Sequence, residues 1–387
     1  MMGPTFLKRI GWIAFWLLML HFVIEITGHH YIYNTLGNTV FQGRLGPGIQ
    51  EYKDMPNRVM AMDKPQPWPI SQRFGKLALT DAEEAYHQEY ESVSFVVIHR
   101  DSLIYEQYWE GFTDTSRSNS FSMAKSIVGL LTGVAIERGE IKSVNDPVYH
   151  YLPQYEAGLG KQMTLEHLLT MSSGINFDES YINPFAFPAR ANYGDDLEAL
   201  LRNYEVTETP GERYTYQSGT TQVLAFALKS ATRRELADYA AEYVWKKVGA
   251  EHSAFWSLDD KDGTEKAFCC INAAAKDFAR IGKLYLHHGN WNGVQVVDSA
   301  YVAASVNWPE HGAEYPSESY GYCWWLGDHN GQEFFFMRGI KGQYVLVYPE
   351  EELIVVRMGR TRNVGSGKEH PEDVYDYLDM GLRMIEE

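Results

Sequence analysis

Positively charged residues are scarce in this chain of 387 residues. It contains 34 Lys and Arg against 51 Asp and Glu, which gives a formal net charge of −17. Proteins that bind nucleic acids rely on basic patches to contact phosphates, so this balance argues against a nucleic-acid partner. Hydrophobic residues make up 45% of the chain, enough for a large core and contrary to a disordered protein. A domain commonly has about 100–200 residues, so the length fits one large domain or two closely packed ones.

Cysteine is also rare, with only Cys269, Cys270 and Cys323. No C-x-x-C spacing occurs, which argues against a zinc site or a framework of disulfides. Because free cysteine usually packs as a small apolar side chain, we expect buried thiols; a single bridge between Cys323 and one of the adjacent pair is the alternative. The adjacent histidines at 29–30 and 287–288 lack the i, i+4 spacing of helical metal ligands. No motif implies a metal or a cofactor.

One long apolar run lies near the N-terminus. Lys8 and Arg9 precede residues 10–26, IGWIAFWLLMLHFVIEI, and the next Lys or Arg is Arg44. About 17–25 apolar residues span a bilayer, and the positive-inside rule keeps the N-terminus in the cytoplasm. A small-residue cleavage site is missing, so we favour a retained anchor over a cleaved signal peptide or a buried core helix. Residues 1–30 are therefore expected to be a membrane anchor or signal segment, with the following domain on the periplasmic or extracytoplasmic side.

The rest of the chain divides into two parts. Residues 31–80 are expected to form an extension or linker, because they are rich in Gly, Asn and Pro, and closely spaced prolines favour extended chain. Residues 81–387 are expected to form the globular domain. There, period-2 and period-3.6 patterns indicate strands at both ends and helices between them. Strands are expected at 94–99, 102–108, 321–326, 333–337, 343–348 and 353–358, and helices at 122–138, 165–171, 222–231, 234–248 and 274–287. This order predicts an α+β fold in which early and late strands join one antiparallel sheet.

Ser122 and Lys125 form an S-x-x-K motif at the start of the first of these helices. Residues three apart share one helix face, so the Lys amine can reach the Ser hydroxyl. A serine hydroxyl is a weak nucleophile, and a neighbouring amine can take its proton where burial favours the neutral amine. The motif alone is weak evidence, because a serine in this position can simply cap the helix.

Three further segments follow the motif in a fixed order. They are Asp146-Pro147-Val148-Tyr149-His150-Tyr151-Leu152-Pro153, then residues 164–174, TLEHLLTMSSG, and then residues 210–218, PGERYTYQS. From about residue 90 to 385 the succession resembles the serine β-lactamase and penicillin-binding-protein superfamily, and above all the class C β-lactamases and their esterase relatives. Residues 272–280, NAAAKDFAR, resemble the family's T-A-x-D-x-A-R stretch and are expected to begin a structural helix.

The resemblance assigns a second catalytic element to Tyr216-Gln217-Ser218. In class C enzymes the tyrosine of a Tyr-x-Asn motif helps to pass the proton to the leaving group. A phenol can do this where a nearby cation, here Lys125, favours its ionised form. Ser218 stands where those β-lactamases have Asn, and this departure resembles the 6-aminohexanoate-dimer hydrolases. Ser218 is expected to contact the substrate. Tyr214, two positions earlier, is interpreted as structural.

The third family element is a Lys-Thr-Gly or His-x-Gly sequence on a late strand. No Lys-Thr-Gly occurs, and the nearest equivalent is the RGIKGQ sequence of residues 338–343. Lys341 stands where His is common in hydrolase relatives, so Lys341 and Gly342 are expected to contact the substrate. Lys341 could bind a carboxylate or keep the surroundings of an oxyanion positive, and a surface turn lysine is the alternative. The oxyanion hole is expected to use the N–H of Ser122 and one from the neighbouring strand.

These expectations combine into one hypothesis. The resemblance implies the β-lactamase/DD-peptidase fold, an antiparallel sheet flanked by helices with a helical subdomain. It also implies a serine hydrolase that cleaves an amide or ester bond of a small-molecule substrate through a Ser122 acyl-enzyme, as 6-aminohexanoate-dimer hydrolases do, without a cofactor. A β-lactamase or D-alanyl-D-alanine carboxypeptidase is one alternative. A non-catalytic binding protein tethered to the membrane is the other.

Overall fold

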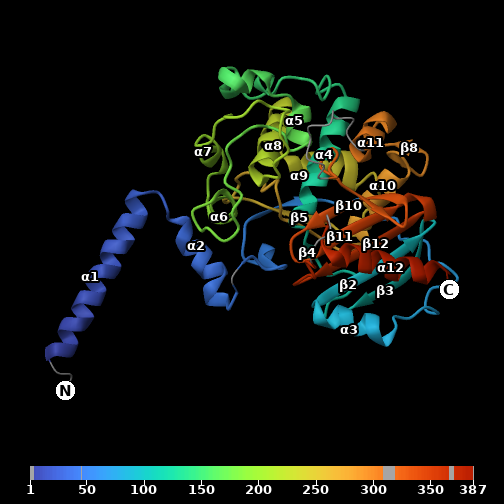
Figure 1. Cartoon of the computed structure of the whole chain (residues 1–387), viewed down its shortest axis with the longest axis horizontal. Helices are drawn as coiled ribbons and strands as arrows, with labels where there is room; N and C mark the ends of the chain where they lie inside the picture. The colour runs from blue at the N-terminus through green and yellow to red at the C-terminus, as the bar shows by residue number, and fades with distance from the viewer. Residues whose placement is uncertain (1–3, 45, 308–318, 366–369, 387) are drawn as a thin grey trace.

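A six-stranded antiparallel sheet forms the centre of the computed structural model, which describes residues 4–44, 46–307, 319–365 and 370–386. The strand order is β3-β2-β12-β11-β10-β9, so the early hairpin joins the late strands as predicted (Figure 1). The strands are β2 (Ser92–His99), β3 (Ser102–Tyr108), β9 (Trp325–His329), β10 (Gln332–Gly339), β11 (Gln343–Tyr348) and β12 (Leu353–Gly359). The α+β fold expected from the sequence is confirmed.

Helices cover both faces of this sheet. The helix α10 (Ala275–Leu286) packs on β11 and β12 on one face, and α12 (Glu372–Glu386) packs on the same strands from the other. Strands β2, β11 and β12 are therefore buried on both sides, which explains their nearly continuous apolar sequences such as LIVVRMG. The helix α3 (Asp81–Glu89) precedes β2 and begins with a capping box between Thr80 and Glu83.

A second, mainly helical part lies beside the sheet. It contains α4 (Met123–Glu137), α5 (Leu165–Leu169), α6 (Phe187–Tyr193), α7 (Leu197–Leu201), α8 (Ser218–Thr232) and α9 (Leu236–Ala240). A small sheet in the order β1-β5-β6-β4 accompanies it, made of β1 (Asn57–Met60), β4 (Ser118–Asn119), β5 (Ala254–Ser257) and β6 (Ile271–Ala273). A hairpin of β7 (Asn290–Trp291) and β8 (Val294–Gln295) precedes α11 (Ser299–Val306). Short 3₁₀ helices occur at Val40–Gln42, Glu51–Lys53, Val148–His150, Pro153–Tyr155, Gly158–Gln162 and Pro349–Glu351.

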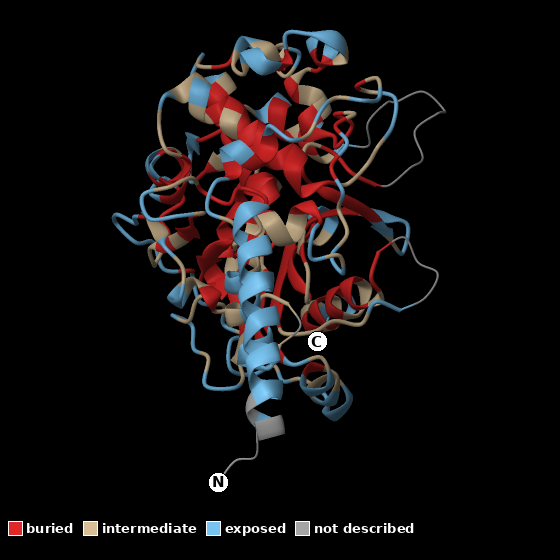
Figure 2. Cartoon of the chain, turned by 90° about the vertical axis from the view of Figure 1, so that its left-hand side faces the viewer, coloured by how far each residue is buried: buried red, intermediate tan, exposed pale blue. Residues whose placement is uncertain are grey.

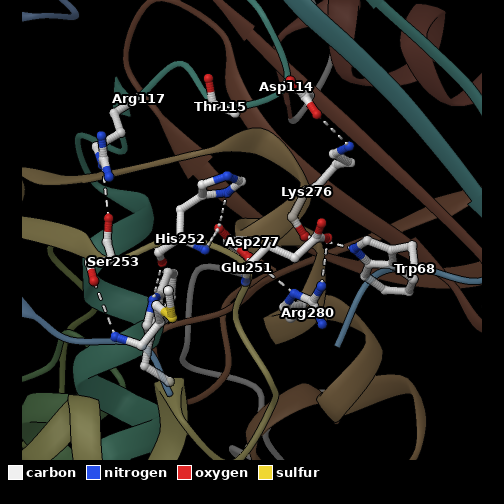
Figure 3. Close-up of polar contacts among 12 residues, drawn as sticks. Trp68, Asp114, Thr115, Arg117, Glu251, His252, Ser253, Lys276, Asp277 and Arg280 are labelled. Atoms are coloured by element: carbon white, nitrogen blue, oxygen red, sulfur yellow. Dashed lines mark hydrogen bonds and ion pairs between the residues drawn. The ribbon is translucent and has the colours of Figure 1, made fainter. Parts of the chain in front are cut away.

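The start of α10 is fixed by a buried polar network (Figure 3). The Asp277 carboxylate accepts hydrogen bonds from the backbone N–H groups of Glu251 and His252 at 2.7 and 3.0 Å. It also pairs with Arg280 at 3.1 Å, and neither of these two side chains reaches solvent. The network ties α10 to the loop before β5, which supports the structural role expected for residues 272–280.

The N-terminal helix α1 (Pro4–Ile26) projects from the domain, and almost its whole surface is exposed (Figure 2). Residues 8–26 are long and apolar enough to cross a membrane, a test that signal sequences also pass. The 31–80 extension does not behave as a free linker. It contains α2 (Tyr31–Asn38), its strand β1 pairs with β5, and Met60 and Trp68 are buried in the main core.

Three expectations need correction. The structure joins Cys269 and Cys270 in a disulfide and leaves Cys323 as a buried thiol, so the expectation of three free thiols was wrong for the adjacent pair. The strand expected at 321–326 begins at residue 325, because Cys323 has a positive φ of 62° that interrupts extended backbone. The helix expected at 234–248 is α9 followed by a π-helical turn, Ala241–Trp245.

Candidate active site

Ser122 lies in the tight turn that enters α4. The preceding residue, Phe121, has a positive φ of 42°, and its N–H donates to the Asn119 side chain at 2.8 Å. Such a backbone angle is unfavourable for a residue with a side chain, so the surrounding structure must hold it. The Ser122 hydroxyl makes no capping hydrogen bond. It lies 2.9 Å from Lys125 Nζ instead, so the structure disfavours the interpretation of Ser122 as a simple helix cap.

Lys125 is almost completely buried, with 1% of its surface exposed. Besides Ser122, its Nζ donates to the carbonyl oxygen of Phe268 at 3.0 Å and to Ser218 Oγ at 3.4 Å. No carboxylate in the described part of the chain forms an ion pair with this amine. The amine is thus held by neutral oxygen atoms, one of which belongs to the candidate nucleophile.

Ser218 is the first residue of α8, and it contacts the carboxylate of Glu179. Its backbone N–H and its hydroxyl donate to the two oxygens of Glu179 at 2.8 and 2.6 Å. The Tyr181 hydroxyl donates to the same carboxylate at 2.7 Å. Glu179 therefore stabilises the N-terminus of α8 and is connected to Lys125 through Ser218. Sequence reasoning missed Glu179, because it belongs to no motif and lies 39 positions before Ser218.

Tyr216 packs beside Lys125. The amine lies 4.9 Å from the centre of the Tyr216 ring, a cation–π distance. The ring is held between Trp325 and Tyr320, at centroid distances of 5.2 and 5.8 Å. Tyr214 contacts Tyr320 at 5.7 Å. The structure thus brings Ser122, Lys125, Tyr216 and Ser218 together, as the sequence predicted.

The end of β10 lies beside the turn that contains Ser122. A Cβ atom on Gly339 would lie 2.3 Å from the carbonyl oxygen of Ser120, so no side chain fits between the strand and the turn. The backbone N–H groups of Ser122 and Ile340 donate no hydrogen bond to any described residue. Both residues line one cavity. Ile340 is therefore the candidate for the second oxyanion donor, which the sequence did not identify.

Arg338 supplies a cation that sequence reasoning did not assign. Its guanidinium stacks on Trp325, with Cζ 3.3 Å from the ring centre. Burial lowers the pKa of Arg338 and nearby Arg362 lowers it further, while Tyr216 opposes this shift. Among the described residues no carboxylate pairs with Arg338. Arg338 does not line the cavity that contains Ser122. It lies beside Tyr216, the candidate proton donor, where a cation can receive an anionic group of a ligand.

Lys341 and Gly342 lie beyond this point, in the turn between β10 and β11. Their carbonyl oxygens accept hydrogen bonds from Arg357 at 3.0 and 2.9 Å. Burial and the charge of Arg44 lower the pKa of Lys341, and Glu51 opposes them. Neither residue lines the cavity that contains Ser122. Their contact with substrate stays a prediction.

The cavity at Ser122 has a volume of about 190 Å³. Ser122, Ser218 and Cys269 line it, and residues 181–184 form part of its wall. Another part comes from the extension before the domain, through Thr35, Thr39, Gly46 and Pro47. Cys269 forms the disulfide with Cys270 and directly follows Phe268. The disulfide is therefore adjacent in the chain to the Phe268 carbonyl group that accepts a hydrogen bond from Lys125.

The histidine pairs noted in the sequence have ordinary partners. His30 pairs with Asp195 at 2.9 Å, and His287 pairs with Asp101 at 2.8 Å. Within the described ranges, no three His, Cys, Asp or Glu side chains are grouped as a metal site requires.

The chain is similar to known proteins in sequence and in structure. A family model described as Beta-lactamase matches residues 79–376. The chain is 25% identical over 286 residues to the 6-aminohexanoate-dimer hydrolase of Paenarthrobacter ureafaciens, which covers 68% of this chain and 71% of that protein. A Bacillus anthracis protein provisionally named a 6-aminohexanoate-dimer hydrolase has a similar structure, with a TM-score of 0.74 at 23% identity over 87% of this chain and 93% of the other. The octameric penicillin-binding protein homologue of Pyrococcus abyssi superposes with a TM-score of 0.59 at 18% identity, over 79% and 78% of the two chains. With the S-x-x-K pair in place at its centre, the chain belongs to the beta-lactamase family of serine hydrolases.

Proposed function

We propose that this protein is an amidase or esterase that works through an acyl-enzyme on Ser122. The observation that carries the proposal is the 2.9 Å contact between Ser122 Oγ and the buried Lys125 Nζ. A serine needs a base within hydrogen-bond reach to become a nucleophile. A protein that only binds ligands has no need of such a pair, so the contact argues against the non-catalytic alternative.

The proposed cycle uses the neighbours of this pair. Ser122 Oγ attacks the substrate carbonyl carbon while its proton passes to Lys125 Nζ, and the backbone N–H groups of Ser122 and Ile340 bind the oxyanion. Tyr216, coupled to Lys125, protonates the leaving amine or alcohol as its bond to the acyl carbon breaks. Water then attacks the ester on Ser122 and gives a proton to the same pair, which passes it to Ser122 Oγ as the bond to the acyl carbon breaks and the acid leaves. Ser218 and Glu179 hold Lys125 and the start of α8 in position.

Two features support a linear amide as the substrate, in the manner of a 6-aminohexanoate-dimer hydrolase. The Tyr216-Gln217-Ser218 sequence resembles that group of enzymes, and the Paenarthrobacter ureafaciens relative has this name. Arg338, which has no carboxylate partner among the described residues, suits a substrate with a free carboxylate. Many β-lactams and D-alanyl-D-alanine peptides also carry a carboxylate, so the same cation keeps the β-lactamase or carboxypeptidase alternative as a second candidate.

The membrane location is part of the proposal. Lys8 and Arg9 precede the apolar stretch and no further Lys or Arg follows until Arg44, which supports an anchor with the catalytic domain on the extracytoplasmic side. The exposed surface of α1 also fits a lipid environment better than water. Detection of intact residues 1–30 in the protein purified from membranes tests retention of the anchor.

The first experiment is intact mass spectrometry after exposure to a fluorophosphonate, for the wild type and Ser122→Ala. One adduct on the wild type and none on the mutant is the expected result. A panel of linear amides, esters and β-lactams with the same two proteins then ranks the substrate classes. A well-folded wild type that takes no adduct contradicts the proposal and favours the binding-protein alternative.

A further inference from the structure

Residues that follow the apolar helix α1 in the chain form part of the wall of the Ser122 cavity. Thr35 and Thr39 belong to α2 and the residue that follows it, and Gly46 and Pro47 belong to the next loop. Only four residues separate the end of α1 at Ile26 from the start of α2 at Tyr31. A candidate membrane span and part of the wall of the candidate active site are therefore adjacent in the chain.

This wall is fastened to the domain on one side. The Tyr31 hydroxyl donates to the carbonyl oxygen of Pro184 at 3.1 Å, and the Asn34 side chain donates to that of Tyr193 at 3.0 Å. Figure 1 shows α2 beside α6 on the side of the domain from which α1 departs. Pro184 and Tyr193 both line the cavity, so these contacts hold α2 against another part of the cavity wall.

The surface around the entrance exposes large apolar side chains. Tyr33 and Leu36 are exposed on α2, and Val40 is exposed at the start of the 3₁₀ turn that follows it. Phe41 is 79% exposed next to them. Ile182, which lines the cavity, is 95% exposed.

The same surface continues at Phe185, which is also exposed and contacts the ring of His29 at 5.5 Å. A group of exposed apolar residues of this kind marks an interaction surface. The group adjoins α1, because the ring of Tyr33 contacts that of His21 in α1 at 5.9 Å. An apolar face beside a membrane span rests in the interface, so a bilayer crossed by α1 is the partner that fits this surface.

We propose that this entrance surface, formed by Tyr33, Leu36, Val40, Phe41, Ile182 and Phe185, lies in the membrane interface. Ser122 then receives amphiphilic esters or amides whose acyl chain stays in the bilayer while the scissile carbonyl enters the cavity. The inference about substrate rests on the proposed function of Ser122, whereas the inference about membrane contact does not. The two can therefore be tested separately.

The membrane contact is tested with full-length protein in phosphatidylcholine vesicles, which are zwitterionic and so avoid repulsion of the acidic chain. A Cys replaces Phe41 or Phe185 and is labelled with an environment-sensitive fluorophore, and doxyl-labelled phosphatidylcholine is the quencher. Val294, an apolar residue in β8 that is as exposed as Phe185, is the matched control, because Figure 1 shows β8 away from α1 and α2. We expect at least twofold quenching at both entrance positions and none at 294. Equal quenching at all three positions, or none, overturns the inference.

The substrate class is tested with the double variant Val40→Ser/Phe41→Ser, whose two residues do not line the cavity. We expect a fall of at least fivefold in kcat/KM for a long-chain p-nitrophenyl ester carried in the vesicles, and a change of less than twofold for water-soluble p-nitrophenyl acetate. Val294→Ser should alter neither. Equal effects on both esters, or no effect, overturn the proposed substrate class. A wild type that cleaves neither ester and takes no fluorophosphonate instead contradicts the proposed function of Ser122, while the quenching result stands.

Discussion

Arg338 offers a sharp test of substrate recognition. Its guanidinium is stacked on Trp325 beside Tyr216, and no described carboxylate neutralises it. If a substrate carboxylate binds there, the change Arg338→Gln removes a charge-assisted hydrogen bond worth about 1.5–3 kcal/mol. That energy corresponds to a loss of roughly 10- to 150-fold in kcat/KM. The loss should be confined to substrates that carry the carboxylate.

The assay compares two linear amides that are identical except for their end, one with a free carboxylate and the other with a neutral carboxamide. Any loss of stacking on Trp325 affects both substrates alike, so the ratio of the two kcat/KM values isolates the charge. Arg360→Gln is the matched control, because Arg360 is already paired with Glu110 at 2.7 Å. A ratio that stays within twofold in Arg338→Gln refutes the assignment of Arg338 to an anionic group of the substrate.

Three further predictions concern stability and redox state. Asp277→Asn breaks a fully buried ion pair and should lower the free energy of unfolding by about 3–5 kcal/mol, measured by urea denaturation, and a loss below 1 kcal/mol contradicts the role given to the network. Burial raises the pKa of Asp373 to about 6, above its value of about 3.9 in the unfolded chain. The contribution of this group to the free energy of unfolding should therefore decline as pH rises from about 4 to 6. Asp373→Asn should make the free energy of unfolding depend less on pH in that range. Thiol titration of the unfolded, unreduced protein should find Cys323 alone, and three thiols after reduction of the bond between Cys269 and Cys270; three thiols before reduction disprove the disulfide.

The sequence predicted the parts of the site that depend on local geometry. Ser122 and Lys125 are one helical turn apart, so their contact follows from the helix itself. The α+β fold followed from period-2 runs at both ends of the domain. Ser218 was predicted through its motif, although its partner Glu179 was not.

The missed features depend on contacts between distant segments. Glu179 reaches Ser218 from 39 positions away, and Arg338 matters only because β9 places Trp325 beneath it and Tyr216 lies nearby. The bond between Cys269 and Cys270 was unexpected because adjacent cysteines seldom meet, and here Cys270 has a positive φ of 74°. No periodicity or spacing in a single sequence specifies such arrangements.

The contribution of α2 and the following loop to the cavity has a practical consequence for producing the protein. Removing everything before the recognisable domain is a natural way to obtain a soluble enzyme. A version that starts after Pro47 keeps Ser122, Lys125 and Tyr216 but lacks Thr35, Thr39 and Gly46. Its active site lacks one wall, and selectivity measured on it describes a more open enzyme than the one in the cell.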